Sequence, residues 1–195
     1  SKYKIDASYL SPNVNMASRL ENLTKQYGVN FLISGPLYNL LSNEVKNYFR
    51  LIDIVTVKGS ILPIKIYTID MKENFKISKK IKTDFSHEHV MNKQIEKKKL
   101  MKSVVETFGV NEWVMKKRSF RKLLKNARPK IFNIIFREGF NSYISGSWAE
   151  AEMKFIDCLK ICENDGPTCT LLDYMKQYEY KAPNDWAGFR KLSSK

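Results

Sequence analysis

Two side chains near the start of the chain, Asn15 and Arg19, have types and a spacing that suit contacts with a sugar and a phosphate group. If the segment is helical, residues four apart leave the same face one turn from each other. An amide can orient a sugar or a base through hydrogen bonds, and a guanidinium can hold phosphate oxygens in a planar fork. Lys58, which precedes Gly59, could add a point charge to a phosphate tail. Taken alone, such a pair is also typical of a solvated helix face.

The residues around this pair carry the signals of a helix. Ser11 suits the N-cap and Pro12 suits the first helical position. Apolar residues then recur at helical spacing, namely Val14, Ala17, Leu20 and Leu23. Gly28 follows as an end signal. The pattern therefore predicts a helix over residues 12–26 that carries Asn15 and Arg19.

The elements that would surround this helix can be read from the first 70 residues. Apolar segments predict strands at residues 3–9 and 29–34, and two more at 49–57 and 62–69, joined by a turn at 58–60. Residues 35–42 predict a second helix. The order strand, helix, strand, helix, strand, strand is typical of an α+β sandwich in which helices cover one face of a sheet.

Several blocks of sequence follow one another in a recognisable order. They are Asn13–Glu21 (NVNMASRLE), Leu23–Val29 (LTKQYGV), Leu32–Ser34 (LIS), Phe49–Asp53 (FRLID), Val57–Gly59 (VKG) and Pro63–Tyr67 (PIKIY). With these blocks, residues 4–70 resemble the C-terminal half of the catalytic domain of class III nucleotidyl cyclases, the adenylate and guanylate cyclases. The resemblance implies the second half of a ferredoxin-like cyclase fold. The ending Asp185–Leu192 (DWAGFRKL) also looks like the tail found after the catalytic domain in some of these cyclases.

The resemblance implies a reaction and a role for each candidate residue. Class III cyclases convert a nucleoside triphosphate to a 3′,5′-cyclic monophosphate and pyrophosphate. By resemblance, Asn15 would orient the ribose, Arg19 would stabilise charge on the α-phosphate, and Lys58 would contact the terminal phosphates. Two Mg²⁺ or Mn²⁺ ions, held by two aspartates, activate the nucleophile in this family.

Two departures from the family pattern limit what this chain could do alone. The metal-binding aspartates of the family lie upstream, and Asp6, Asp53 and Asp70 match neither place, so we assign no metal ligand here. We therefore expect this chain to be a fragment of a longer protein, and we expect the fragment alone to have no cyclase activity. At the position that selects the purine, the chain has Ser8, with Asp6 as a lesser candidate. Members of the family with a hydroxyl at this position are mostly adenylate cyclases, so Ser8 favours ATP as the substrate. A hydroxyl can donate or accept a hydrogen bond, so it does not exclude GTP.

In this family the active site forms between two domains, so the resemblance implies a second cyclase domain as partner. That partner would complete a homodimer or a pseudo-heterodimer, and the sequence leaves both open. The sequence also leaves two alternative functions open. The parent protein could be a guanylate cyclase, or this chain could be a regulatory half that binds nucleotide without catalysis.

The charge of the chain is concentrated in its middle. Of a net charge of +14, residues 71–140 contribute +12, with 19 Lys and Arg against 7 Asp and Glu. Residues 71–100 are lysine-rich and lack a periodic apolar pattern, which predicts a basic linker. A module that binds RNA, DNA or anionic lipid is the rival interpretation. Lysine outnumbers arginine there and aromatic residues are few, so we do not expect nucleic acid as a partner.

The remaining residues, 101–195, predict a helical accessory region. Residues 131–178 suggest a helical hairpin, with Gly139, Ala151 and Phe155 at tetratricopeptide-like positions. Three cysteines, at positions 158, 162 and 169, suggest buried thiols in a reducing compartment. No segment resembles a signal peptide or a membrane span. We therefore expect a location on the cytoplasmic side, with any membrane contact made by parts outside this chain.

Overall fold

The computed structural model describes residues 12–57, 62–71 and 128–192, together with residues 95, 96, 98, 99, 102 and 103. The chain divides into two compact units. The first contains residues 1–41, 49–69 and 128–195, and the second contains residues 42–48 and 70–127. The expected strand at 3–9, the turn at 58–60 and most of the basic linker lie outside the described residues. The predicted boundaries of the three segments, 1–70, 71–100 and 101–195, therefore stay predictions.

The N-terminal part of the first unit contains the elements that periodicity predicted. Helix α1 (Pro12–Gln26) is followed by β1 (Ile33–Ser34), α2 (Gly35–Asn39), β2 (Phe49–Thr56) and β3 (Ile64–Ile69). Strand β1 and helix α2 are shorter than expected, whereas α1, β2 and β3 have nearly the expected bounds. The α+β fold class is confirmed.

The four described strands form one sheet in the order β1-β3-β2-β4, where β4 (Arg190–Lys191) comes from the C-terminus. Strand β3 pairs antiparallel with both β1 and β2. Strand β4 pairs parallel with the end of β2, with Val55 opposite Arg190. The register of β2 against β3 shifts between Leu51 and Asp53, as expected of a β-bulge.

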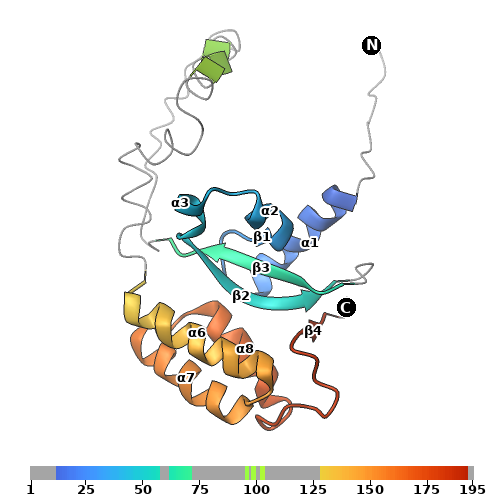
Figure 1. The fold of residues 1–195 in the computed structure, drawn as a ribbon, viewed down its shortest axis with the longest axis vertical. Coiled ribbons are helices and arrows are strands. Elements are labelled where there is room, and N and C mark those ends of the chain that lie inside the picture. Colours follow the sequence, from blue (N-terminus) through green and yellow to red (C-terminus); the bar gives the residue numbers. More distant parts are fainter. Residues whose placement is uncertain are drawn as a thin grey trace, which may run out of the picture. The chain divides into compact units, whose positions relative to one another are not determined.

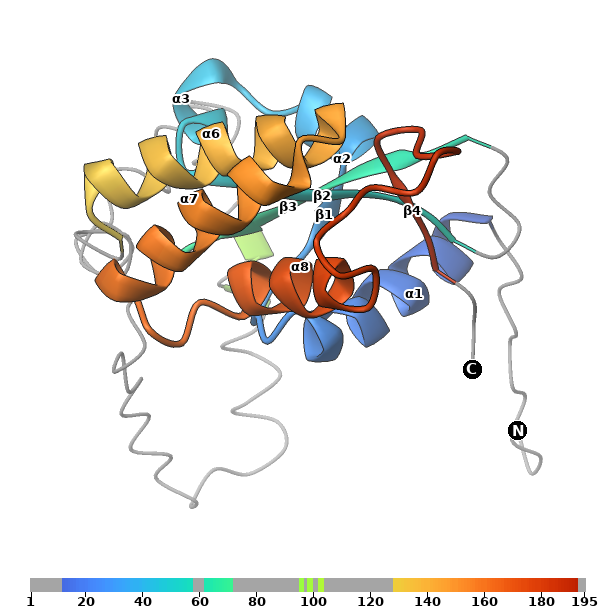
Figure 2. The ribbon, with the colours of Figure 1, turned by 90° about the horizontal axis from the view of Figure 1, so that it is seen from below.

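The C-terminal part of the first unit contains three helices, not the two of the expected hairpin. They are α6 (Lys130–Ser145), α7 (Trp148–Ile161) and α8 (Gly166–Lys176). Helices α6 and α7 form the expected antiparallel hairpin, and α8 follows it and lies beside α1 (Figures 1 and 2). The sheet therefore has helices on both faces, where the sequence predicted helices on one face only (Figure 1).

A separate apolar core fills each side of the sheet. On one side, Leu20, Leu23 and Tyr27 of α1 pack with Ile52 and Val55 of β2, among others. On the other side, the core consists of side chains from α6, α7 and α8, namely Phe132, Phe136, Phe140, Tyr143, Trp148, Ala151, Phe155, Cys158, Leu171 and Met175. Leu51 and Ile54 of β2 pack against this second core. The bulge lets Ile52 and Val55, three residues apart, face the same side.

Helix α1 ends as its sequence predicted, but the apolar stripe predicted for it is buried only in part. Gly28 has a φ of +59°, and the N–H of Val29 donates to the carbonyl of Thr24, which is the bonding pattern of a glycine C-cap. Leu20 and Leu23 are buried as expected, whereas Val14 is 49% exposed and Ala17 is also exposed. Only the C-terminal half of the predicted apolar stripe therefore packs on the sheet.

The described residues of the second unit are helical at 95, 96, 98, 99, 102 and 103 and include one further short helix. Helix α3 (Asn43–Lys46) begins at Ser42, whose hydroxyl accepts from the N–H of Val45 at 3.5 Å. Across all the residues that the structure describes, no helix is long and apolar enough to cross a lipid bilayer.

Candidate functional site

Asn15 and Arg19 both lie on α1, one turn apart, as their spacing predicted. The Asn15 side chain is exposed and the Arg19 side chain is half-buried. Both precede Leu20, the first α1 residue buried on the sheet. The structure thus brings the amide and the guanidinium to the same helix face, in the N-terminal half of α1. Ser8 and Lys58, the other two candidates, lie outside the described residues.

The other end of α1 is held by a buried network of polar side chains. The hydroxyl of Tyr27, which follows the last residue of α1, donates to the Oδ2 atom of Asp53 at 2.6 Å. Arg190 of β4 donates from Nε to the same carboxylate oxygen at 2.7 Å, and from Nη2 to the Tyr27 hydroxyl. The N–H of Ile54 donates to the second oxygen of Asp53 at 2.7 Å. Asp53 therefore has a partner for each oxygen although it is fully buried.

Burial and the contact between Asp53 and Arg190 together set the pKa values in this network. It raises the pKa of the Asp53 carboxyl above its ordinary value, while Arg190 and the hydrogen bonds from Tyr27 and Ile54 act in the opposite direction. Burial, reinforced by Asp53, raises the pKa of the Tyr27 phenol well above its ordinary value. Burial alone would lower the pKa of Arg190, but the carboxylate of Asp53 leaves it raised overall. The guanidinium is therefore charged, and Tyr27 acts as a neutral donor.

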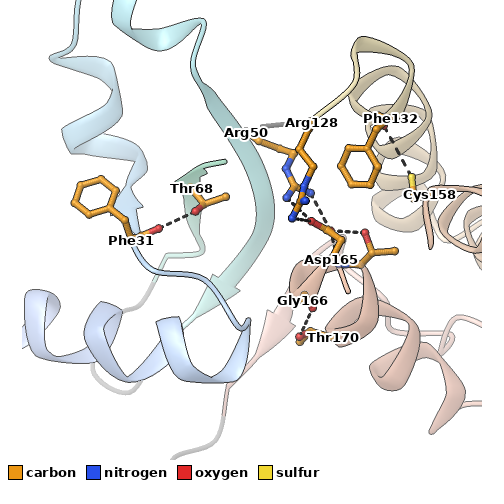
Figure 3. A network of polar contacts seen from close by, with 10 residues as sticks. Phe31, Arg50, Thr68, Arg128, Phe132, Cys158, Asp165, Gly166 and Thr170 are labelled. Carbon is orange, nitrogen blue, oxygen red and sulfur yellow. Dashed lines mark hydrogen bonds and ion pairs between the residues drawn. The ribbon is translucent and has the colours of Figure 1, made fainter. Parts of the chain in front are cut away.

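A second buried network joins β2 to the start of α8 (Figure 3). Arg50 of β2 makes two hydrogen bonds to the carboxylate of Asp165, at 2.8 and 3.1 Å, in the fork geometry that strengthens such pairs. Arg128 approaches the same carboxylate at 3.1 Å. The Arg50 guanidinium also lies over the ring of Phe136, 4.4 Å from its centroid.

Asp165 has a second task as the N-cap of α8. Its Oδ2 atom accepts from the N–H of Thr168 at 3.1 Å and from the Thr168 hydroxyl at 2.6 Å. Burial tends to raise the pKa of Asp165, but Arg50 and the bonds from Thr168 outweigh it and leave that pKa below the ordinary value. The network fixes the start of α8 against the sheet.

The start of α8 in turn contacts the end of α1. The Thr170 hydroxyl donates to the carbonyl of Gln26 at 3.1 Å. A Cβ atom placed on Gly166 would lie 2.1 Å from the carbonyl oxygen of Tyr27, so only glycine permits this approach. The helix that carries Asn15 and Arg19 is therefore held at its C-terminal end by both the sheet and α8.

The two buried aspartates of the described residues do not fit the pair of divalent ions that the resemblance implies. Among the described residues, no group of three His, Cys, Asp or Glu side chains lies close enough to hold a metal ion. The buried carboxylates of Asp53 and Asp165 are already neutralised by arginines. A carboxylate bound in this way has neither the free oxygens nor the exposure that Mg²⁺ requires.

Sequence reasoning missed both buried networks. The available signal was the presence of Arg50 and Asp53 within an apolar strand, since a charged residue in a buried strand needs a partner. The partners themselves are 115 and 137 residues away along the chain. No spacing rule connects residues so far apart, so the pairing could not be predicted from the pattern alone.

A comparison with curated proteins agrees with part of the resemblance. Over 67 residues, the chain is 45% identical to an adenylate cyclase from Anabaena cylindrica. One region of this chain is cyclase-related. The match covers 34% of this chain but only 13% of that protein, so the activity of the whole relative does not transfer by itself. No family profile and no solved structure matches the chain.

Proposed function

We propose that this chain contributes the Asn and Arg half of a class III adenylate cyclase site, which converts ATP to 3′,5′-cyclic AMP and pyrophosphate. The single observation that carries the proposal is the placement of Asn15 and Arg19 on one face of α1, within a chain that has a cyclase-related region. The second half of a ferredoxin-like cyclase fold and a tetratricopeptide-like tail belong to the same proposal. The order of α1, β1, α2, β2 and β3 supports the first, and the α6–α7 hairpin supports the second.

The proposed chemistry is an in-line displacement at the α-phosphorus of ATP. The 3′ oxygen of the ribose forms a bond to phosphorus, the bond from phosphorus to the bridging oxygen of pyrophosphate breaks, and the 3′ hydroxyl loses its proton. Asn15 would hold the ribose so that the 3′ oxygen faces phosphorus. Arg19 would donate to the α-phosphate oxygens as negative charge accumulates there. Lys58 would contact the terminal phosphates, and Ser8 would contact the purine.

A second cyclase domain has to complete the site, because neither buried aspartate of the described residues is available for metal. Asp53 and Asp165 are paired with arginines, so the ligands for Mg²⁺ or Mn²⁺ would come from outside this chain. The exposed side chains of Asn15 and the apolar Val14 support such sharing, because the described residues do not cover them. The partner would be a second copy of the parent protein or a different cyclase domain, on the cytoplasmic side of a membrane or in the cytoplasm.

A complementation assay tests this proposal. The full chain is mixed with a homodimeric cyclase domain that keeps its metal-binding aspartates but has its own Asn and Arg replaced by Ala. We expect cyclic AMP from ATP in the mixture and none from either protein alone. Arg19→Ala should lower the rate about 10²–10³-fold, as loss of a positioned transition-state donor typically does. Asn15→Ala should also lower it, by weakening ribose orientation.

Matched controls separate this role from general damage to the fold. Asn22→Ala changes an exposed asparagine on the same helix, and Arg137→Ala changes an exposed arginine on α6, so neither should alter the rate. If Asn15→Ala and Arg19→Ala behave like these controls, the proposed roles are wrong. If the mixture binds ATP but forms no cyclic AMP, the chain is a non-catalytic regulatory half. Formation of cyclic GMP in preference to cyclic AMP would identify a guanylate cyclase, and exchange of Ser8 would then test purine selection.

A further inference from the structure

The C-terminal segment 186–192 is fixed to the first unit at several points. The Trp186 indole N–H donates to the carbonyls of Tyr143 and Ile144 at 3.1 and 3.2 Å. Gly188 has a φ of +81°, and a Cβ there would lie 3.1 Å from the Ile144 carbonyl oxygen. The N–H of Leu192 donates to the Thr56 carbonyl at 3.0 Å. The segment therefore runs from the end of α6 to the edge of β2 along a defined path (Figure 2).

Arg190 is the point at which this segment reaches the buried interior. Its side chain is 4% exposed and its guanidinium faces the carboxylate of Asp53. The guanidinium also lies over two aromatic rings, 5.4 Å from the centroid of Tyr27 and 4.9 Å from that of Tyr174. An arginine enclosed in this way presents its donors in fixed directions, unlike a flexible lysine.

Tyr27 connects Arg190 to helix α1. Its N–H donates to the Leu23 carbonyl at 3.0 Å, so it continues the last turn of the helix. Its side chain is fully buried, and its hydroxyl is bonded to both Asp53 and Arg190. Since the Tyr27 ring and backbone are both held, the direction in which α1 leaves the sheet is fixed at this residue. Asn15 and Arg19 lie at the other end of the same helix, three and two turns away.

We infer that residues 186–192 form a clamp on α1 and that Arg190 is a positioning residue for Asn15 and Arg19. The inference rests on the proposed function, because a positioning role has meaning only if those two residues contact substrate. Its structural part, that Arg190 holds α1 through Tyr27, can be tested without any activity. A small rotation of α1 about Tyr27 would be amplified along the helix, and displacements of about 1 Å at reacting groups can reduce rates about 10²-fold.

Hydrogen exchange measured by mass spectrometry on the full chain tests the structural part. Arg190→Gln removes the guanidinium that holds Tyr27. Tyr27→Phe keeps the ring but removes the bridging hydroxyl, and this milder change provides a readout if the first variant folds poorly. In each variant we expect amides of residues 12–26 to exchange about tenfold faster, with less change in residues 130–145.

A core variant distant from the clamp serves as the control. Phe155 is fully buried between α6 and α7 and does not belong to the core that contains α1. Phe155→Leu should therefore accelerate exchange in residues 130–145 more than in residues 12–26. Equal acceleration of both segments in Tyr27→Phe and Arg190→Gln, or no acceleration in either, would overturn the clamp.

The complementation assay then separates the clamp from the proposed function. Arg190→Gln and Tyr27→Phe should lower kcat about tenfold with little change in the KM for ATP, since they misplace groups that act in the transition state. If Arg19→Ala abolishes activity but both clamp variants keep the wild-type kcat, the function stands and the inference is wrong. If the wild-type mixture makes no cyclic AMP, the function fails, while hydrogen exchange still decides whether Arg190 holds α1.

Discussion

Arg50 and Asp53 are two charged residues on one otherwise apolar strand, and each is neutralised from the far end of the chain. Arg50 pairs with Asp165 before α8, and Asp53 pairs with Arg190 in β4. Since all four side chains are buried, each pair is costly to break although its net contribution to stability is small. The two pairs fix where the C-terminal elements meet the sheet.

At the scale of single residues, we predict that Arg50→Gln is strongly destabilising. The change leaves the buried carboxylate of Asp165 with Arg128 as its remaining cationic partner. We expect a loss of about 3 kcal/mol in the free energy of unfolding, near the lower end for a broken buried pair. Chemical denaturation of the full chain measures this. Arg137→Gln, an exposed arginine on α6, should change the stability by no more than about 0.5 kcal/mol. Similar effects for the two variants would contradict the prediction.

The lowered pKa of Asp165 predicts how stability depends on pH. In the unfolded chain this carboxyl has its ordinary pKa near 4, and in the folded chain its pKa is lower because of Arg50 and Thr168, although burial opposes the shift. As the pH falls below about 4, the unfolded state takes up the proton first, so the free energy of unfolding decreases.

Denaturation between pH 7 and pH 3 checks this sign. Asp165→Asn should lower stability at pH 7 and should remove part of the loss seen on acidification, because no carboxyl remains to titrate. Asparagine still caps a helix, so the start of α8 is preserved. An Asp165→Asn variant with the same acid dependence as the unaltered chain would show that another group causes it.

At the scale of elements, the contact between α1 and α8 depends on the absence of a side chain. The two helices lie side by side (Figure 2). They meet where Gly166 faces the backbone of Tyr27, and the Thr170 hydroxyl donates to the carbonyl of Gln26. The α6–α7 hairpin has a similar close approach, since a Cβ on Gly139 would lie 2.9 Å from the Cβ of Lys154. Backbone atoms and Cβ atoms cannot move aside as a flexible side chain can, so these contacts are specific to glycine.

We therefore predict that Gly166→Ala separates α8 from α1. The added methyl group would lie 2.1 Å from the Tyr27 carbonyl oxygen, and relieving the clash should cost about 1–3 kcal/mol. Gly35→Ala is the matched control at the start of α2, where the nearest atom is 3.5 Å away, an ordinary contact distance. Thermal unfolding of both variants measures the difference. The prediction is wrong if Gly166→Ala is as stable as Gly35→Ala.

The elements differ in how well local sequence determined them. Periodic apolar residues, with Pro12 at the start and Gly28 at the end, placed α1 correctly, and apolar segments joined by a turn placed β2 and β3. Helix α8 was not separated from the expected hairpin, although Asp165 and Pro167 carry its start signals. Strand β4 has only two residues and pairs with β2, and the contact between Arg190 and Asp53 that accompanies this pairing joins residues that no local pattern connects. The position of Asn15 and Arg19 on one face of α1 was predictable because both residues lie on the same helix, four positions apart.

At the scale of the whole chain, the cyclase-related region and the C-terminal helices are not independent in the first unit. Helix α6 contacts β2 where the ring of Phe136 lies under Arg50, and α8 contacts the end of α1 through Thr170. Strand β4 contacts both β2 and Tyr27 through Arg190. The sheet thus has its second helical layer supplied by residues about a hundred positions further along the chain (Figure 1). Truncation after β3 would leave Asp53 without its guanidinium and Leu51 and Ile54 without their core.

The rate of cyclic AMP formation tests the central claim most directly, when the full chain is titrated into a cyclase domain that retains its aspartates but lacks its own Asn and Arg. We predict a saturable rise in rate with added chain, reduced about 10²–10³-fold by Arg19→Ala. No rise at any ratio of the two proteins, or a rise that Arg19→Ala leaves unchanged, would contradict the claim that this chain supplies the Asn and Arg half of a cyclase site.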